Sequence, residues 1–301
     1  MHASVYGISG LGWGTLQAIC YARRPMQPMK QFRCPNGLRV WGAPGTGVEI
    51  NLIFREIFED RCYERLGITI CDGDVILDIG ANIGLFALSL MERFYGLKIV
   101  CVEPAPLTRA CLERNVADSP RRDRHQITIL SDAIGAENAE AMITYFPRLP
   151  GNSTLCLAEK RKEWNRMIED VGPAQLQRIH KELGLLPRWI ARLILKPMLK
   201  NAVTQPCKVR TVTNIVAELD LSRIDLLKID VEGAEMDALH GITESDWRRI
   251  RQLVMEVSPR HKGSLDEVVE RLRAKGFSKV AAESFTGGVV ALDDPMPSML
   301  Y

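Results

Sequence analysis

The sequence has no Cys-x-x-Cys pair, no large excess of charge of either sign and no long uninterrupted apolar run. Its eight cysteines are scattered, so neither a zinc site nor a disulfide framework is expected, and no metal is predicted. The net charge of +2 gives no overall field for nucleic acid or a membrane surface, and neither a nucleic-acid partner nor a membrane span is expected. Because Cys101 falls in an apolar segment typical of a core strand, a reducing compartment is favoured and a cytoplasmic location is expected.

The first residues do not follow the pattern of the rest of the chain. With 301 residues, the chain is long enough for one large domain with appendages. The segment Gly7–Gly14 has the glycines of a nucleotide-binding turn, but no strand precedes it, so no site is predicted there. Asn36-Gly37 lies between short β-prone runs and predicts a hairpin outside the main sheet. Residues 1–48 are therefore expected to form an N-terminal arm, lid and hairpin.

The most informative stretch is Asp74–Ser89, which predicts a buried strand, a glycine turn and the start of a helix. Its first part is a short apolar run suited to an interior parallel strand, and Gly80 and Gly84 let the backbone turn sharply beside a ligand. Asn82 is expected to cap the helix that follows. The turn has no lysine after its second glycine, so it is not a P-loop, and the acidic Asp78 favours a cationic or hydroxyl-rich ligand.

A second strand also ends in a carboxylate. Lys98–Glu103 is an apolar segment, and Glu103 lies about 20 residues beyond Gly84, the spacing at which an acidic side chain accepts hydrogen bonds from a ribose in nucleotide-binding βαβ units. These residues leave three interpretations open: a site for S-adenosylmethionine, a dinucleotide site, and a structural strand-turn-helix without a ligand.

The segment Gln126–Leu130 predicts a third strand whose end is again acidic. In this kind of sheet the loop after the third strand lies over the base of a bound nucleoside. Asp132 would then accept a hydrogen bond from an exocyclic amine, while Ala133 would offer a backbone amide. The alternative is that Asp132 only caps a turn.

Two later strands bring more charge to the same edge. Ile224–Glu235 predicts a fourth strand with Lys228 and Asp230 on one face, and a fifth strand carries Glu256 within an apolar run. If these strands are neighbours, Lys228 can pair with Glu256 and satisfy both charges. The alternative is a catalytic role, because parallel sheets place ligands at the carboxyl ends of their strands. The segment 277–292 is expected to close the sheet with an antiparallel last strand.

Residues 155–205 interrupt the alternation of strands and helices with a helical insertion that has twice as many basic as acidic residues. Within it, Leu186–Pro197 places Arg188, Arg192 and Lys196 on one face of an amphipathic helix. One interpretation is a segment that packs its apolar side on the domain. The other is a lid over the acceptor pocket, or a docking site for an acidic partner such as an acyl or peptidyl carrier protein.

Four motifs point to one family. They are Asp78–Gly84, Glu103-Pro104, Asp132–Gly135 and Leu227–Glu235. They resemble the FkbM family of S-adenosylmethionine-dependent methyltransferases, and the residues flanking the last motif are most similar to members that serve polyketide and nonribosomal peptide pathways. The resemblance implies an α/β fold of the class I methyltransferase type, Rossmann-like, with a seven-stranded, mostly parallel sheet and helices on both faces. It also implies a methyltransferase domain over residues 49–301 that contains the insertion.

The resemblance further implies how S-adenosylmethionine is held. Residues 80–84 would cradle its methionine portion, Glu103 its ribose, and Asp132 with Ala133 its adenine. Glu56 or Tyr63, from an amphipathic helix expected over 49–65, is an alternative contact to the amino-acid end. The expected cofactor contacts are Asp78, Gly80, Ala81, Asn82, Gly84, Glu103, Pro104, Asp132 and Ala133.

Methyl transfer to a hydroxyl requires a group that removes a proton. Asp230 is the first candidate, and His261 is the alternative, because an unperturbed histidine titrates at about pH 6.5. Family members often have a histidine directly after the fifth strand, where this chain has Ser258-Pro259. The expected catalytic residues are Asp230, His261, Lys228 and Glu256, and the expected acceptor contacts are Asn152, Ser153 and Glu232.

The expected activity is therefore O-methylation of a small-molecule hydroxyl on a polyketide, nonribosomal peptide or sugar, either free or tethered to a carrier protein. One alternative is an RNA or protein methyltransferase that uses the basic insertion. Another is a non-catalytic scaffold that binds S-adenosylmethionine and docks through the helix at 186–197. No Asp/Asn-Pro-Pro-Tyr/Phe tetrapeptide follows the fourth strand, as it does in many amino-methylating enzymes of nucleic acids.

Overall fold

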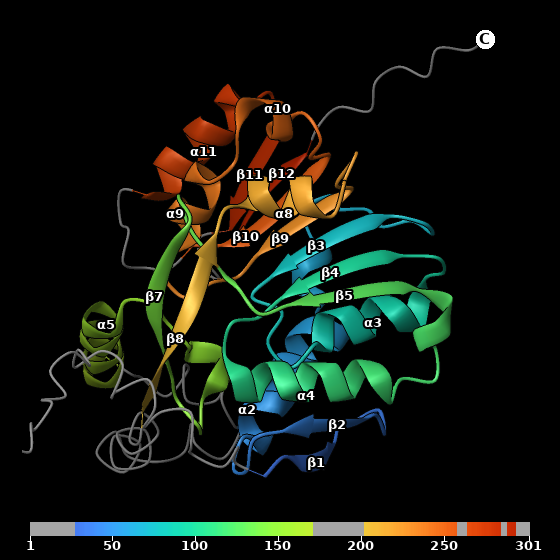
Figure 1. Ribbon diagram of the computed structural model, residues 1–301, viewed down its shortest axis with the longest axis vertical. Helices are drawn as coiled ribbons and strands as arrows, with labels where there is room; N and C mark the ends of the chain where they lie inside the picture. The colour runs from blue at the N-terminus through green and yellow to red at the C-terminus, as the bar shows by residue number, and fades with distance from the viewer. Residues whose placement is uncertain (1–27, 171–201, 258–263, 284–287, 293–301) are drawn as a thin grey trace, which may run out of the picture.

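A mostly parallel β-sheet forms the centre of the computed structural model, which describes residues 28–170, 202–257, 264–283 and 288–292 (Figure 1). Its strand order is β11-β12-β10-β9-β3-β4-β5. Five neighbouring strands are parallel: β10 (Gln252–Glu256), β9 (Leu226–Ile229), β3 (Val75–Ile79), β4 (Lys98–Val102) and β5 (Gln126–Leu130). β12 (Gly288–Leu292) runs antiparallel to both β10 and β11 (Lys279–Glu283). The predicted mostly parallel sheet, with its antiparallel last strand, is confirmed.

Helices pack on both faces of this sheet, as predicted. Successive side chains of a strand point to opposite faces, so a strand that is apolar throughout must be covered on both sides. In β3, Leu77 and Ile79 join one apolar cluster and Ile76 joins another. The first cluster includes residues of α8 (Val212–Glu218), α9 (Glu235–His240), α10 (Glu244–Trp247) and α11 (Ser264–Ala274). The second includes residues of α2 (Gly47–Phe54), α3 (Leu85–Arg93) and α4 (Pro106–Ala117). In the described part of the chain, no helix is both long and apolar enough to cross a bilayer.

The predicted helix over residues 49–65 is instead three short segments. α2 continues into a π-helical turn, η1 (Arg55–Glu59), and a 3-10 turn, η2 (Cys62–Glu64), follows. The helix cannot continue because Arg61 has a left-handed backbone, with a φ of 49°. Leu66 is left-handed as well, so the chain is bent on both sides of η2. The bends turn η2 toward the sheet, and Glu64 anchors it to α3 through two hydrogen bonds from Arg93 at 2.6 Å.

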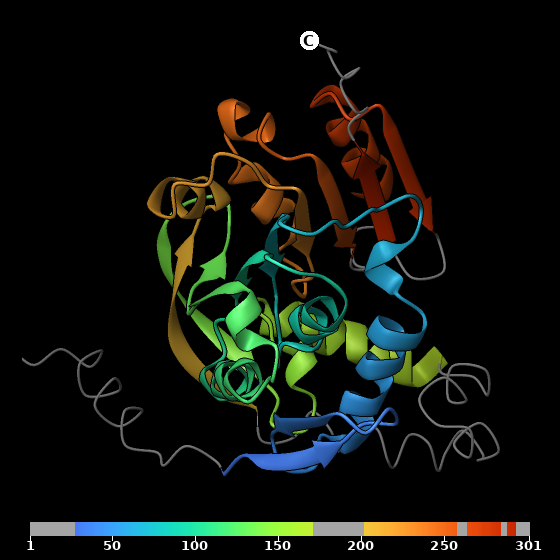
Figure 2. The same cartoon turned by 90° about the vertical axis from the view of Figure 1, so that its right-hand side faces the viewer.

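A second, three-stranded sheet was not predicted. It has the order β6-β8-β7, with β6 (Ala133–Ile134), β7 (Ala139–Tyr145) and β8 (Val203–Arg210). Pro206 in β8 disfavours a central strand, but it lies opposite Met142 of β7, beyond the two residues that pair with β6, so its missing N–H disrupts no second ladder. Figure 2 shows β7 and β8 along one side of the molecule and the segment from α2 to β3 along the other.

Only part of the predicted helical insertion belongs to the described structure. Helix α5 (Leu157–Asp170) opens it, but the last residues of the insertion, from Val203 on, belong to strand β8 and are not helical as predicted. The basic helix expected at 186–197, with Arg188, Arg192 and Lys196, lies outside the described residues, as does the N-terminal arm over 1–27.

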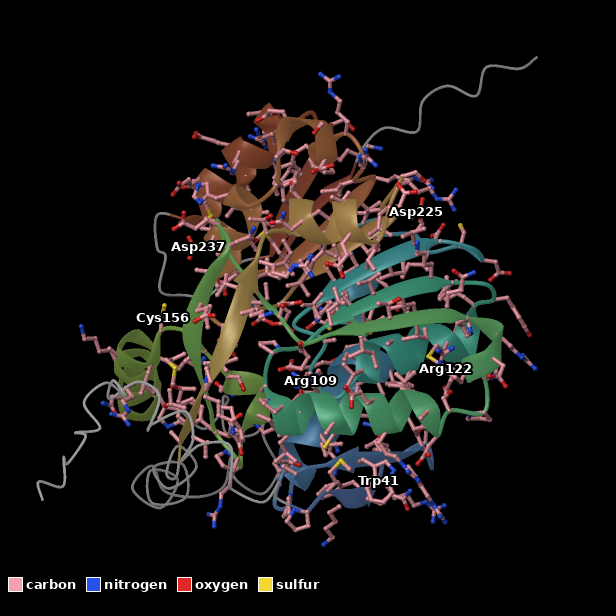
Figure 3. All side chains as sticks on the ribbon, viewed as in Figure 1. Trp41, Arg109, Arg122, Cys156, Asp225 and Asp237 are labelled. Atoms are coloured by element: carbon pink, nitrogen blue, oxygen red, sulfur yellow. The ribbon has the colours of Figure 1, made fainter. Side chains whose placement is uncertain are left out.

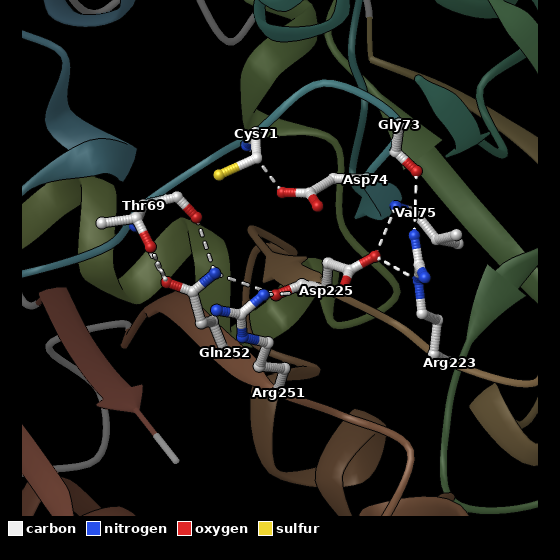
Figure 4. A network of polar contacts seen from close by, with 9 residues as sticks. All are labelled: Thr69, Cys71, Gly73, Asp74, Val75, Arg223, Asp225, Arg251 and Gln252. Carbon is white, nitrogen blue, oxygen red and sulfur yellow. Dashed lines mark hydrogen bonds and ion pairs between the residues drawn. The ribbon is translucent and has the colours of Figure 1, made fainter. Parts of the chain in front are cut away.

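A polar network fixes the amino ends of three central strands (Figure 4). The Asp225 carboxylate accepts hydrogen bonds from the Val75 backbone N–H and from Arg223, each at 2.8 Å. Gln252 donates to the Thr69 carbonyl at 2.7 Å and to the Asp225 carbonyl at 3.1 Å. These bonds connect β3, β9 and β10 at the edge where the strands begin, and so help to set the register that aligns their opposite, carboxyl ends.

The predicted hairpin with Asn36-Gly37 at its turn is confirmed. β1 (Lys30–Arg33) pairs with β2 (Arg39–Gly42) outside the main sheets and packs against α4, where Figure 3 labels Trp41. Asn115 of α4 makes the connection. Its side chain accepts from the Trp41 N–H at 2.6 Å and donates to the carbonyls of Trp41 and Ile83, at 3.0 and 2.8 Å. One buried amide thus joins the hairpin, α4 and the glycine turn before α3.

Asn115→Ala should lower the free energy of unfolding by about 2–4 kcal/mol, because it leaves buried backbone groups of the hairpin and the turn without partners. Asn51→Ala, at an exposed position of α2, is the matched control and should change it by less than about 0.5 kcal/mol. Urea unfolding followed by circular dichroism measures both variants. Equal stability of the two would contradict the structural role of Asn115.

Candidate functional site

An open cleft of about 650 Å³ lies at the carboxyl ends of β3, β4 and β9. The chain runs from β3 outward to β4 and β5 and later returns to β9 on the other side of β3, so the strand order reverses between β3 and β9. Ligands of open α/β sheets bind at such a reversal.

Most of the predicted site residues meet in this cleft. From the cofactor set, its lining includes Gly80, Asn82, Glu103, Pro104, Asp132 and Ala133. From the other predicted sets it includes Asp230, Ser153 and Glu232. Asp78, Ala81, Gly84, Asn152, Lys228 and Glu256 are not in the lining. His261 lies outside the described residues, so its role stays a prediction.

The glycine turn brings the backbone close to both neighbouring strands. Gly80 has a φ of +79°, and a Cβ added to it would lie 1.8 Å from the Asp230 carbonyl oxygen. The N–H groups of Gly80 and Ala81 donate to the Val102 carbonyl, each at 3.0 Å. Only glycine fits this position, because the turn requires both a left-handed backbone and contact with the β9 backbone.

The prediction that Asn82 caps α3 is wrong. Gly84 occupies the N-cap position, and Asn82 has a left-handed backbone with a φ of 49°. That conformation aims the Asn82 N–H at the Glu103 carboxylate, 3.0 Å away. Among the described residues, the buried Asn82 Oδ1 has no hydrogen-bond partner. An unsatisfied acceptor in the lining of a cleft fits a ligand that donates hydrogen bonds.

Glu103 is held firmly at the end of β4. Its carboxylate accepts from the N–H groups of Asn82 and Ala105, at 3.0 and 2.9 Å, and Arg109 donates to its backbone carbonyl at 3.3 Å. Burial raises the pKa of Glu103 to about 7, although the two amides and the positive charge of Arg109 oppose the shift. The remaining lone pairs of a fixed carboxylate suit a pair of ligand hydroxyls.

Asp132 is buried at the end of β5, and sequence reasoning missed its partner. Arg210, the last residue of β8, lies 3.5 Å from the Asp132 carboxylate. Arg210 reaches Asp132 because β8 pairs with β6, and the sequence did not predict that pairing.

A buried row of charges links the strands under the cleft. Lys228 Nζ lies 2.9 Å from Asp78 Oδ1, 3.0 Å from the Gly80 carbonyl oxygen and 3.7 Å from Asp230 Oδ2. Burial alone would lower the pKa of Lys228, but the carboxylates of Asp78 and Asp230 raise it above its ordinary value. The Tyr63 hydroxyl donates to Asp230 Oδ2 at 2.6 Å, and Lys228 Nζ lies 4.9 Å from the centre of the Tyr63 ring.

The predicted pairing of Lys228 with Glu256 is wrong. β9 and β10 are neighbours, as expected, but their register places Lys228 opposite Val254. On the other side, β3 places Asp78 directly opposite Lys228, so the lysine turns to that strand. Glu256 is exposed at the end of β10. Partial desolvation, and then the negative charges of Asp230 and other nearby carboxylates, raise its pKa.

A carboxylate that was not predicted as a site residue contacts Gly151, which lines the cleft. Glu49 of α2 is 8% exposed and accepts a hydrogen bond from the Gly151 N–H at 3.0 Å. Burial raises the pKa of Glu49 to about 8, and the charge of Glu232 contributes to the shift. Glu232 is paired with Lys160 of α5 at 2.7 Å. The only sequence signal was an acidic residue at the start of an otherwise apolar helix face, and it did not indicate a site.

A glycine turn, a mostly parallel sheet and acidic side chains at successive strand ends define a nucleoside-binding α/β protein. The methyltransferase FkbM domain model matches residues 78–279. The chain therefore belongs to the FkbM methyltransferase family, as the motifs predicted, and is an S-adenosylmethionine-dependent methyltransferase.

Several named relatives are similar over most of the chain. The 31-O-demethyl-FK506 methyltransferase FkbM of Streptomyces tacrolimicus is 34% identical over 262 residues, which are 85% of this chain and 91% of that protein. Methyltransferase sdnD of Sordaria araneosa is 31% identical over 239 residues, 76% of this chain and 83% of that protein. The AMB antimetabolite synthetase AmbE of Pseudomonas aeruginosa is 35% identical over 250 residues, 81% of this chain but 11% of that protein.

Solved methyltransferase structures are more distant. Magnesium protoporphyrin IX methyltransferase (ChlM) from Synechocystis with bound S-adenosylmethionine matches with a TM-score of 0.38 and 9% identity, over 96% of this chain and 100% of that one. The N-terminal domain of human METTL16 in complex with S-adenosylhomocysteine matches with a TM-score of 0.36 and 12% identity, over 83% and 71%. At these TM-scores, the family assignment rests on the sequence matches.

Gly80→Ala should unfold the turn or abolish cofactor binding. The new methyl group would clash with the Asp230 carbonyl oxygen, and alanine would be strained at this positive φ. Gly73→Ala is a matched control with the same φ of +79° and no atom within 4 Å of the added Cβ. It should cost only about 1–2 kcal/mol and keep full binding. Calorimetric titration with S-adenosylhomocysteine and thermal melts distinguish the two variants, and intact binding by Gly80→Ala would refute the tight approach.

Proposed function

We propose that the protein transfers a methyl group from S-adenosylmethionine to a hydroxyl of a small natural product, with Asp230 as the general base. The observation that carries the proposal is the arrangement of Asp230. Its side chain lines the cleft and is 31% exposed, while one of its oxygens, Oδ2, is engaged by Tyr63 and Lys228. The carboxylate is therefore held in one orientation with Oδ1 available to a ligand.

The cofactor would lie along the edge of the sheet. Residues 80–84 would hold its methionine portion, Glu103 the ribose hydroxyls, and Asp132 with Ala133 the adenine. Support comes from the lining of the cleft, the unsatisfied Asn82 oxygen and the fixed Glu103 carboxylate. Ser153 and Glu232, which also line the cleft, would face the acceptor, and Asn152 would sit behind them.

S-adenosylmethionine supplies a methyl group on a positively charged sulfur, which leaves as a neutral thioether. The acceptor hydroxyl must lose its proton as the new carbon–oxygen bond forms, and Asp230 Oδ1 would accept that proton. Lys228 stays protonated beside it, with its Nζ 3.7 Å from Asp230 Oδ2. Tyr63 and Lys228 prevent rotation of the carboxylate, so the acceptor is aligned with the methyl group.

The class of acceptor is supported by the relatives. One is named for methylation at an oxygen of FK506, and another is an antimetabolite synthetase of which this chain matches a small part. A free or carrier-tethered natural product with a hydroxyl group is the acceptor that these names favour. The alternative, an RNA or protein acceptor bound by the basic insertion, depends on a helix outside the described residues.

A salt titration separates the two classes of acceptor. Binding through phosphate contacts weakens steeply as salt rises, whereas binding of a neutral metabolite does not. Incubation with S-adenosylmethionine labelled in its methyl group, hydroxylated metabolites and total RNA, followed by location of the label, identifies the acceptor. Label found only in RNA or protein would refute the proposal.

Asp230→Asn should lower turnover about 10²- to 10⁴-fold, because the isosteric amide cannot take up a proton. The affinity for S-adenosylhomocysteine should stay within about twofold. Asp237→Asn, at an exposed position of α9, is the control and should keep full turnover. A parallel His261→Ala variant tests the other candidate base. Full activity of Asp230→Asn together with loss of activity in His261→Ala would reassign the proton transfer.

A further inference from the structure

The side chain of Glu49 lies where the glycine turn and the loop after β7 meet. It accepts a hydrogen bond from the Gly151 N–H, and a Cβ on Gly151 would lie 3.0 Å from Glu49 Oε1 and 3.3 Å from Asn82 Nδ2. Both side chains therefore crowd the same glycine, and both Gly151 and Asn82 line the cleft. Glu49 and the Asn82 side chain, whose Oδ1 has no hydrogen-bond partner among the described residues, thus lie against the same wall of the cleft.

Glu49 differs from five other carboxylates in and beneath the cleft in what compensates its charge. These five have a cation or two backbone donors: Asp78 has Lys228, Asp230 has Lys228 and Tyr63, Glu232 has Lys160, Asp132 has Arg210, and Glu103 has the amides of Asn82 and Ala105. Within the described ranges, no cation lies within ion-pair distance of Glu49, and its hydrogen bond comes from one neutral amide. A buried carboxylate without a counter-ion is strongly disfavoured, so this wall is suited to a cationic ligand.

We propose that Glu49, together with Asn82 Oδ1, binds the α-ammonium group of S-adenosylmethionine. The ammonium donates three hydrogen bonds, and these two oxygens supply acceptors for two of them. Its charge also offsets the repulsion between Glu49 and Glu232. The inference rests on the proposed placement of the methionine portion over the glycine turn. It assigns to α2, outside the family's matched segment, a direct contact with the cofactor.

The charge state of Glu49 changes when such a ligand binds. Burial raises its pKa to about 8, so in the free protein the carboxyl is mostly protonated at pH 7. Glu232, from the loop after β9, faces it and is offset by Lys160 of α5, while Asn82 and Gly151 are neutral. A bound ammonium favours the ionised form. Binding at pH 7 should therefore release a proton from Glu49, and cofactor affinity should rise with pH from about 6 to about 8.

Three ligands separate the parts of the cofactor that Glu49 contacts. S-adenosylmethionine has both the ammonium and the carboxylate, decarboxylated S-adenosylmethionine keeps the ammonium alone, and 5′-methylthioadenosine lacks both. Isothermal titration at pH 7 measures each ligand against the wild-type chain, Glu49→Gln and Glu137→Gln. Glu137 is exposed in the loop after β6 and serves as the control.

Glu49→Gln should weaken binding of the two ligands with an ammonium group about 10- to 100-fold and leave methylthioadenosine within about twofold. Glu137→Gln should match the wild-type chain with all three. Unchanged binding of S-adenosylmethionine by Glu49→Gln would overturn the inference. So would a loss seen with S-adenosylmethionine but not with its decarboxylated form, because Glu49 would then contact the carboxylate.

The wild-type chain gives a second test that needs no variant. Titrations in phosphate and in Tris at pH 7, where an α-amino group with a pKa of about 7.7–8.0 is mostly charged, count the protons released on binding. S-adenosylmethionine should release about 0.7–0.8 of a proton more than methylthioadenosine, because uptake by its partly neutral amino group offsets part of the release from Glu49. The comparison with methylthioadenosine also corrects for any titration of Glu103. No difference between the ligands would refute the inference, even if Glu49→Gln lost all binding. Failure of the wild-type chain to bind any of the three would refute the placement of the cofactor itself.

Discussion

The structure of the site depends on the ion pair between Lys228 and Asp78. The two residues face each other across β9 and β3, at the reversal of strand order where the cleft opens, and both are almost completely buried. A charge left alone in such a place would be strongly destabilising, so each residue requires the other. The lysine also reaches the Gly80 carbonyl and the Asp230 carboxylate. Lys228 therefore connects β3, the glycine turn and Asp230, the residue proposed to act on the acceptor.

The polar groups around the cleft fall into two sets, one at the ends of the strands and one in the segments on the opposite side. On the sheet side, backbone amides hold Glu103, whose pKa burial raises to about 7, and its remaining lone pairs suit ligand hydroxyls. On the opposite side, α2, η2 and the loop after β7 supply Glu49, Tyr63 and Gly151. The sheet thus presents fixed groups from strand ends, and the covering segments add Tyr63, which holds Asp230, and Glu49, which is proposed to contact the cofactor.

The sequence predicted the parts of this arrangement that repeat along the chain. Apolar runs ending in Gly80, Glu103, Asp132 and Asp230 indicated parallel strands, and parallel strands bring their carboxyl ends to one edge. Pairings across strands were harder to predict, because they depend on register. Lys228 was assigned to Glu256, yet the register with β10 places it opposite Val254, and the register with β3 places it opposite Asp78. The β6-β8-β7 sheet, and with it the Arg210–Asp132 contact, was missed because Pro206 and the adjoining helical pattern concealed a strand.

Two residues that contact the lining of the cleft lie outside the segment that the family model matches. The match begins at residue 78, whereas Glu49 and Tyr63 belong to the preceding segment, which is bent by left-handed residues and a π-helical turn so that it lies over the sheet. The set of residues around the site is accordingly larger than the segment that the family model matches. A chimaera that carried only the matched segment would keep the strand ends that line the cleft but lose Glu49 and Tyr63. Comparisons of relatives that begin at residue 78 would leave out both positions.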